Sequence, residues 1–379
     1  MFITSIEALI IKVPGRCGGS RRLTPHAGPE AQCQPFETVL ARVTTDAGIA
    51  GWGESQATSA PEVAGAIIHS ILKPALEGKP FGGTGLEIET LWNAMYNRTR
   101  TSGQTGGFML DAMAAVDIAL WDLGGRIHGA SIASLIAGRG ARRKIETYVD
   151  RLAGETLEER LESAAACRAA GCRRFRIAYD SSRRELLENY DALARLCGAE
   201  NVAVDGLCRL DAGRSASFAA ELDRRGALWL ARPFAADDVA AHAALAARTR
   251  TPIAIGETHR THTELAPFFR AHAMRIVQPD LGRCGITEGL RIARAAEREG
   301  VEIAPRLSSA LGPLLFATLQ FAAAVPNCRL APYAPGLVET VNGFASAPVR
   351  FRDGCYAVPG GPGLGVELME PEVRLVAVA

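Results

Sequence analysis

PIAIGETHRTHTELAPFFRAHAMRIVQPD, at residues 252–280, contains the alternation that decides the fold. Two short apolar runs, PIAIGE and MRIVQPD, stand on either side of a longer segment of helical character. Short apolar runs that flank a helix are typical of buried parallel strands. The stretch therefore predicts a strand–helix–strand unit.

The same alternation extends on both sides of this unit. Helical segments lie near 156–170, 183–198, 213–225 and 236–248. The eight strand-like runs are IETYV (145–149), RRFRIAY (173–179), NVAVD (201–205), ALWLA (227–231), PIAIGE (252–257), MRIVQPD (274–280), VEIAP (301–305) and CRLAP (328–332). Strands that alternate with helices in this way predict an α/β fold, a TIM-type (β/α)7β barrel. Chemistry in such barrels takes place at the C-terminal ends of the strands, so the last residues of each run are the candidates for a site.

The sequence before the barrel has another pattern. Alternating residues at 2–13 and 37–48, followed by GIAGWGES at 48–55, predict a short antiparallel sheet. Residues 14–35 show no periodicity and predict a long loop, and loops of this length are usually functional or disordered. Helical patterns follow at about 61–77, 86–99 and 109–128.

Composition excludes several classes of protein. A chain of 379 residues exceeds the usual size of a single core, so two structural units are expected. Basic and acidic residues nearly balance, 42 against 41, and no basic block stands out, which argues against a nucleic-acid partner. The nine cysteines form no CxxC pair and are expected to be reduced. No signal peptide and no apolar run of about 20 residues is present, so we expect a cytoplasmic protein without a membrane partner.

Four segments resemble one known family. They are DAGIAGWGES (46–55), DAMAAVDIALWDLGGRIHGASIASLIAG (111–138), IVQPDLGRCGITEGLRIA (276–293) and DGCYAVPGGPGLGVEL (353–368). Each is similar to a segment of the mandelate racemase/muconate lactonizing enzyme family of the enolase superfamily. The resemblance runs in consistent order from about residue 2 to residue 370.

The resemblance implies both an architecture and a reaction. It implies an α+β N-terminal capping domain (1–128), the barrel (129–335) and a C-terminal segment (336–379) that returns to complete the cap. It further implies an isomerase or lyase, such as a racemase, epimerase or dehydratase, which removes the proton next to a small substrate's carboxylate. In this family Mg²⁺ stabilises the resulting enolate. We expect a homo-oligomer that uses no organic cofactor.

The metal ligands implied by the resemblance are only partly present. They are expected at the ends of the third, fourth and fifth barrel strands. Asp205 and Glu257 match the first and third ligands, whereas Ala231 replaces the middle one. Mg²⁺ often binds through few protein ligands and several waters, so Asp205 and Glu257 remain the candidate metal ligands.

The acid and base groups implied by the resemblance have changed further. The second strand is expected to carry Lys-x-Lys, but it reads Arg176-Ile177-Ala178. Arg176 stays protonated and is a poor base, although it can bind a carboxylate. Asp280 is present on the sixth strand, but its expected histidine partner on the seventh strand is Arg306. We therefore expect Asp280 to face the permanent cation of Arg306.

Further candidates lie near the same strand ends and in the long loop. Tyr179 and His259 are candidate catalytic residues beside Asp280, Arg176 and Arg306, because histidine titrates near neutral pH. A single histidine in such a loop is nevertheless more often a surface residue. Candidate substrate-binding residues are Arg176, Arg306 and, from the loop that closes over the substrate in this family, His26.

Three functions remain open at this point. The first is an isomerase or lyase that acts on a small carboxylate with non-standard acid and base residues. The second is a non-catalytic descendant that binds an anion in the same pocket. The third is a metal-independent barrel enzyme in which Arg176 and Arg306 supply the electrostatic stabilisation. Fold alone does not choose among them.

Overall fold

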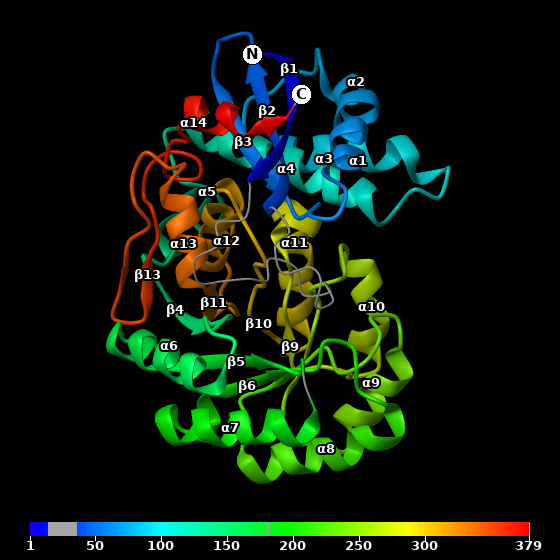
Figure 1. The fold of residues 1–379 in the computed structure, drawn as a ribbon. Helices are drawn as coiled ribbons and strands as arrows, with labels where there is room; N and C mark the ends of the chain where they lie inside the picture. Colours follow the sequence, from blue (N-terminus) through cyan, green and yellow to red (C-terminus); the bar gives the residue numbers. More distant parts are fainter. Residues whose placement is uncertain (14–35, 181, 379) are drawn as a thin grey trace.

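The computed structural model describes residues 1–13, 36–180 and 182–378, with a small sheet and its helices above a barrel (Figure 1). The small sheet has the strand order β14-β1-β2-β3. Its strands are β1 (Ile3–Val13), β2 (Phe36–Thr45), β3 (Ala50–Ser55) and β14 (Ala377–Val378). All its pairs are antiparallel, and β14 pairs with β1, so both ends of the chain meet in this cap (Figure 1).

Helices pack against the cap sheet and against one another. They are α1 (Pro61–Ile67), a π-helical turn (Ile68–Leu72), α2 (Lys73–Leu76), α3 (Gly85–Arg100) and α4 (Phe108–Ile127). α3 begins with a capping box, in which Thr84 and Glu87 exchange hydrogen bonds. α4 is buried along most of its length because it packs against β3 on one side and α11 (Leu281–Arg298) on the other.

Eight parallel strands form the barrel, as the sequence pattern predicted. They are β4 (Lys144–Val149), β5 (Arg174–Ala178), β6 (Val202–Asp205), β7 (Leu230–Ala231), β8 (Ile253–Ile255), β9 (Ile276–Val277), β10 (Glu302–Ile303) and β11 (Leu330–Tyr333). Neighbouring strands from β4 to β10 pair in sequence order, and β11 pairs with β4. A parallel bridge between Ile303 and Cys328 closes the ring, so the predicted fold class is confirmed.

Seven helices connect these strands. They are α6 (Leu157–Ala169), α7 (Arg183–Cys197), α8 (Ala212–Arg225), α9 (Val239–Ala246), α10 (His262–Arg270), α11 and α12 (Pro313–Ala324). Most of them begin where a short polar side chain accepts a hydrogen bond from a backbone N–H of the first turn. The capping residues are Thr156, Ser182, Asp238, Thr261 and Asp280. Asp280 is therefore held in place by the start of α11.

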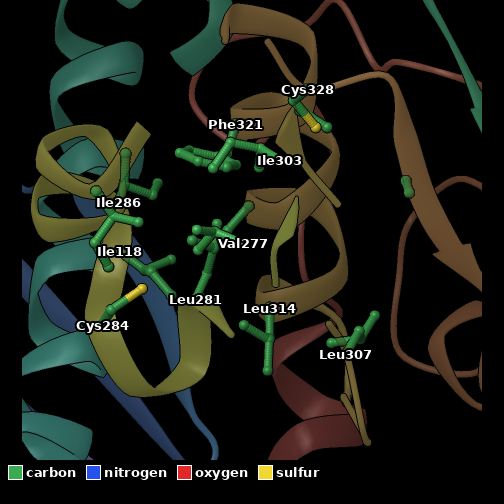
Figure 2. Close-up of a cluster of buried hydrophobic side chains, with 14 of the residues drawn as sticks. Ile118, Val277, Leu281, Cys284, Ile286, Ile303, Leu307, Leu314, Phe321 and Cys328 are labelled. Atoms are coloured by element: carbon green, nitrogen blue, oxygen red, sulfur yellow. The ribbon is translucent and has the colours of Figure 1, made fainter. Parts of the chain in front are cut away.

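The cap and the barrel share one apolar core. Ile118 of α4, Ile286 of α11 and Phe321 of α12 belong to the same buried cluster as Val277 of β9 (Figure 2). A separate cluster fills the barrel interior, with Tyr148 and Trp229 as its largest members. Burial of this apolar surface fixes the ends of the barrel strands relative to the cap.

The C-terminal segment contacts the barrel before it reaches the cap. α5 (Ile132–Ala137) precedes the barrel, and α13 (Pro335–Asn342) follows β11. β12 (Phe351–Arg352) and β13 (Cys355–Ala357) form a hairpin whose second strand pairs antiparallel with β4. α14 (Glu370–Leu375) then leads into β14. No helix among the described residues has the length and apolar character needed to cross a bilayer.

Glu54, at the end of β3, joins the cap to the start of α12. Its carboxylate is fully buried and accepts hydrogen bonds from the backbone N–H groups of Leu311, Gly312 and Leu314, at 2.6, 3.2 and 3.1 Å. Burial raises its pKa from 4.5 to about 7, although these hydrogen bonds oppose the shift. The folded protein therefore keeps a proton on Glu54 at pH values where the unfolded chain has lost it.

A Glu54→Gln variant is expected to gain stability relative to the wild type as the pH rises from 5 to 8. In the wild type, protonated Glu54 contributes up to about 3 kcal/mol to the free energy of unfolding, and this contribution is lost as the pH rises through about 7. Glutamine has no proton to lose. Urea unfolding of both proteins at the two pH values measures this change. Exposed Glu339 provides the control, because Glu339→Gln should differ from the wild type equally at both pH values. If the difference in free energy of unfolding between Glu54→Gln and the wild type does not change with pH, the raised pKa of Glu54 is refuted.

Candidate active site

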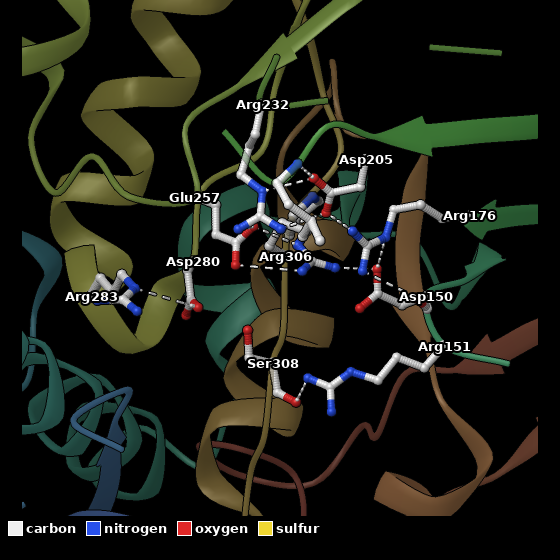
Figure 3. Close-up of polar contacts among 12 residues, drawn as sticks. Asp150, Arg151, Arg176, Asp205, Arg232, Glu257, Asp280, Arg283, Arg306 and Ser308 are labelled. Atoms are coloured by element: carbon white, nitrogen blue, oxygen red, sulfur yellow. Dashed lines mark hydrogen bonds and ion pairs between the residues drawn. The ribbon is translucent and has the colours of Figure 1, made fainter. Parts of the chain in front are cut away.

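Charged side chains gather at the C-terminal ends of the barrel strands (Figure 3). Each of the strands β4 to β10 contributes one of them, either from its last residues or from the residues that follow it. They are Asp150, Arg176, Asp205, Arg232, Glu257, Asp280 and Arg306. Every one of them is at most 7% exposed to solvent. Buried charges need partners of opposite sign, so the contacts among these side chains decide the chemistry of the site.

Arg176 and Arg306 each bridge two carboxylates. The Nε atom of Arg176 donates to Oδ1 of Asp150 at 2.7 Å, and its Nη1 atom pairs with Asp205. The Nε atom of Arg306 donates to Oε2 of Glu257 at 3.0 Å, and its Nη1 atom pairs with the same Asp150. Asp150 thereby links the two arginines, a role that the sequence analysis did not predict.

Arg232 is a third arginine in this network, and it too was missed. Its Nε atom donates to Oδ1 of Asp205 at 3.1 Å, and its Nη1 atom lies 2.9 Å from Oε2 of Glu257. The residue has a φ of 45°, in the left-handed region that non-glycine residues rarely adopt. Regular alternation along β7 places Ala231 in the barrel interior and would direct the next side chain outward. The unusual backbone of Arg232 returns its guanidinium to the mouth of the barrel.

The network is electrically balanced. Three guanidinium groups (Arg176, Arg232, Arg306) face three carboxylates (Asp150, Asp205, Glu257), here called the arginine–carboxylate cluster. Burial alone would raise the pKa of Glu257, but Arg306 and Arg232 outweigh it and hold that pKa well below its usual range. Burial lowers the pKa of Arg176 to about 10, which still leaves it charged at neutral pH. The cluster is thus fully ionised and close to neutral overall.

Asp280 lies at the same mouth but outside these pairs. Its Oδ1 atom accepts a hydrogen bond from the N–H of Gly282 at 2.9 Å, whereas its buried Oδ2 atom has no hydrogen-bond partner among the described residues. The nearest ion-pair contact is with Nε of Arg283, at 4.0 Å (Figure 3). Burial raises the pKa of Asp280 to about 7. This carboxyl group can therefore gain and lose a proton near neutral pH.

The expected pairing of Asp280 with Arg306 is wrong. The two residues share a backbone bridge, but the guanidinium of Arg306 points to Asp150 and Glu257. Two fully ionised carboxylates attract it, while Asp280 is held by the first turn of α11. The expectation overlooked Asp150, which follows β4 directly and stands immediately after the first strand-like run in the sequence.

The remaining predicted residues do not join the cluster. His259 is buried, with Nε2 at 2.9 Å from the carbonyl oxygen of Ala236 and its ring against Phe268. Burial lowers its pKa to about 4, so it is neutral at pH 7. Tyr179 stacks on Phe218 of α8, outside the barrel. His26 lies outside the described residues.

The candidate metal ligands do not fit a divalent ion in this arrangement. Asp205 and Glu257 are both at the mouth, but the guanidinium of Arg232 lies between them and pairs with each. Within residues 1–13, 36–180 and 182–378, no group of three His, Cys, Asp or Glu side chains is placed to hold a metal. A divalent cation here would have to displace a charged arginine.

Arg151 adds a further cation next to the cluster. It follows Asp150 at the end of β4, and its Nη2 atom donates to the carbonyl oxygen of Ser308 at 2.6 Å (Figure 3). Burial lowers its pKa, which Asp150 partly offsets. Arg151 therefore places a further positive charge next to the balanced arginine–carboxylate cluster.

Comparison with known proteins agrees with the fold. Residues 20–137 match the model of the mandelate racemase/muconate lactonizing enzyme N-terminal domain, and residues 159–372 match the enolase C-terminal domain-like model. The chain is 31% identical to D-galactarolactone cycloisomerase of Agrobacterium fabrum, over 87% of this chain and 88% of that protein. It is 30% identical to D-galactonate dehydratase of Verminephrobacter eiseniae, over 89% of this chain and 90% of that protein.

Solved structures have the same architecture. A putative isomerase from Sinorhizobium meliloti superposes with a TM-score of 0.89 at 29% identity, covering 100% of this chain and 99% of that one. A racemase from Streptomyces coelicolor, solved with bound magnesium, superposes with a TM-score of 0.86 at 22% identity and covers 100% of both chains. The likeness to the racemase concerns the fold alone.

Proposed function

Because the chain belongs to the mandelate racemase/muconate lactonizing enzyme family of the enolase superfamily, we propose that it is an isomerase or lyase acting on a small carboxylate. We propose Asp280 as the group that transfers the proton next to that carboxylate. The relatives D-galactarolactone cycloisomerase and D-galactonate dehydratase are named for a sugar-acid lactone and a sugar acid. A sugar acid or its lactone is therefore the proposed substrate class.

The observation that carries this proposal is the state of Asp280. It is a fully buried carboxyl group, one of whose oxygens accepts no hydrogen bond from the described residues, and burial raises its pKa to about 7. A general base works best when its pKa is close to the working pH. The other carboxylates of the mouth are held by arginines, which makes them weak bases.

The proposed reaction needs only groups of this chain. Asp280 takes the proton from the carbon next to the substrate carboxylate, and the C–H electron pair moves into that carboxylate to form an enediolate. Arg151, Arg176 and Arg306 favour the added negative charge. In an isomerase, the proton returns to carbon. In a dehydratase, the electron pair expels the hydroxyl of the next carbon, which takes the proton from Asp280 and leaves as water.

Proton exchange in deuterated water tests this function. The purified protein is incubated with a panel of aldonates, aldarates and their lactones, and deuterium next to the carboxylate is followed by NMR. We expect exchange or turnover with at least one of these acids. The proposal is refuted if none of them exchanges or reacts, with or without added Mg²⁺.

The internal pairing of the cluster favours a second candidate, a non-catalytic anion-binding protein. Each of its carboxylates already has an arginine partner, and Ala178 stands where the resemblance implies a basic lysine. In this case a sugar acid raises the melting temperature without exchanging its proton. Thermal unfolding with the same panel of acids separates the two functions.

A further inference from the structure

We propose that the guanidinium of Arg232 is a built-in replacement for a divalent metal ion, and that its removal converts this end of the barrel into a metal site. Asp205 ends β6, Arg232 follows β7 and Glu257 follows β8. The middle strand of three neighbours thus places a cation between carboxylates from the strands on either side. This inference concerns binding alone and holds whether or not the protein is an enzyme.

The contacts of Arg232 occupy the oxygens that a metal would need. Its Nε and Nη2 atoms both pair with Asp205, one to each carboxylate oxygen. Its Nη1 atom lies 2.9 Å from Oε2 of Glu257. Arginine is suited to this place because its planar guanidinium is always charged and offers several donors in fixed directions. Only 4% of the side chain is exposed, so water competes little for these contacts.

The backbone around Arg232 is built to hold this position. Its N–H donates to the carbonyl oxygen of Ala254 at 3.0 Å, and its own carbonyl oxygen accepts from Cys208 at 2.8 Å. Leu207 and Cys208, just after Asp205, also have left-handed φ angles, of 51° and 58°. Left-handed conformations at non-glycine residues persist only where the surroundings enforce them, and they concentrate at functional sites.

Charge balance makes the guanidinium and a metal mutually exclusive. With Arg232 present, three arginines match three carboxylates at this mouth. A divalent cation would add two positive charges to a balanced, buried cluster, where repulsion between like charges is strong. Without the guanidinium, Asp205 and Glu257 still pair with Arg176 and Arg306, but three carboxylates then face two arginines, and the mouth keeps one net negative charge. Two carboxylates and several waters are an ordinary environment for Mg²⁺ or Mn²⁺.

Mn²⁺ binding to the full chain tests the inference. Free Mn²⁺ is measured by electron paramagnetic resonance during titration of the wild type, Arg232→Ala and Arg232→Lys after treatment with a chelator. The control is Arg209→Ala, which removes an exposed arginine from the loop after β6. We expect one Mn²⁺ per chain in Arg232→Ala, bound at least about tenfold more tightly than by the wild type and Arg209→Ala, with the affinity of Arg232→Lys between these limits. Because ligand binding stabilises the folded state, Mn²⁺ should also raise the melting temperature of Arg232→Ala but not that of the wild type or Arg209→Ala.

Each outcome of the Mn²⁺ titration supports or refutes the inference. Stoichiometric, tight Mn²⁺ binding by the wild type would overturn the inference, as would a folded Arg232→Ala that binds no better than Arg209→Ala. An Arg232→Ala variant that folds only with Mn²⁺ supports it. If that variant folds under neither condition, the comparison of wild type with Arg232→Lys decides. Tighter Mn²⁺ binding by Arg232→Lys than by the wild type supports the inference, because a single amino group cannot pair with both carboxylates. Equal binding by the two proteins refutes it.

Discussion

Replacing Arg306 by alanine is expected to lower the free energy of unfolding by about 3–5 kcal/mol at pH 8. The side chain is 1% exposed and pairs with both Asp150 and Glu257. Its removal leaves two buried carboxylates short of positive charge. Breaking a buried ion pair on one side costs far more than the pair contributes, because the remaining charge stays desolvated.

The effect of this change depends on pH in a defined direction. In the wild type the pKa values of Asp150 and Glu257 are lowered, so their contribution is complete above the unfolded values and is lost as the pH falls through the folded ones. In Arg306→Ala, the positive charge that opposes the effect of burial is gone, so the pKa values of Asp150 and Glu257 should rise. The stability cost should therefore be smaller at pH 4 than at pH 8.

Urea unfolding at the two pH values checks this prediction. Arg329→Ala is the matched control, since Arg329 is 77% exposed and its contact with Glu302 is 3.7 Å long. The control should be indistinguishable from the wild type. A loss for Arg306→Ala no larger than that of the control would mean that the cluster does not stabilise the fold.

Asp280→Asn is expected to reduce proton exchange or turnover by about 10²–10⁴-fold. Asparagine keeps the shape and can still accept the hydrogen bond from Gly282, but it cannot take a proton. Since the base must be ionised, the rate of the wild type should rise with pH and level off above the pKa of Asp280, at about 7. The variant should lose this dependence together with the activity.

The rate is measured by NMR in deuterated water with the acid that reacts fastest. Asp353→Asn, which changes an 84% exposed aspartate, serves as the control and should retain full activity. Wild-type rates and an unchanged pH profile in Asp280→Asn would show that Asp280 does not transfer the proton. Unchanged stabilisation of that variant by the acid would show that binding survived.

The barrel was predictable because its signal repeats. All eight short apolar runs, from IETYV to CRLAP, overlap the strands that the structure forms, since a strand inside a parallel sheet is mostly apolar. The cap strands were predictable from alternation, because one face is buried. The pairing of β13 with β4 was not, because it joins residues far apart in the sequence and depends on tertiary packing.

The site was predictable where a residue lies at a regular strand end. Arg176, Asp205, Glu257 and Arg306 meet at one mouth for that reason. Arg232 was missed because alternation assigns it to the outer face, and only its left-handed φ reverses that direction. His259 was expected near the chemistry, but the loop after β8 packs it against Phe268. Side-chain direction beyond the end of a strand depends on loop conformation, which a single sequence does not specify.

A crystal structure of the wild type grown with excess MnCl₂ tests the central claim most directly, because anomalous scattering identifies manganese. The claim is that a guanidinium stands between Asp205 and Glu257 in place of a metal. It predicts electron density for the Arg232 side chain between the two carboxylates and no anomalous peak there. A manganese peak bound by Asp205 and Glu257, with Arg232 turned away, would contradict it.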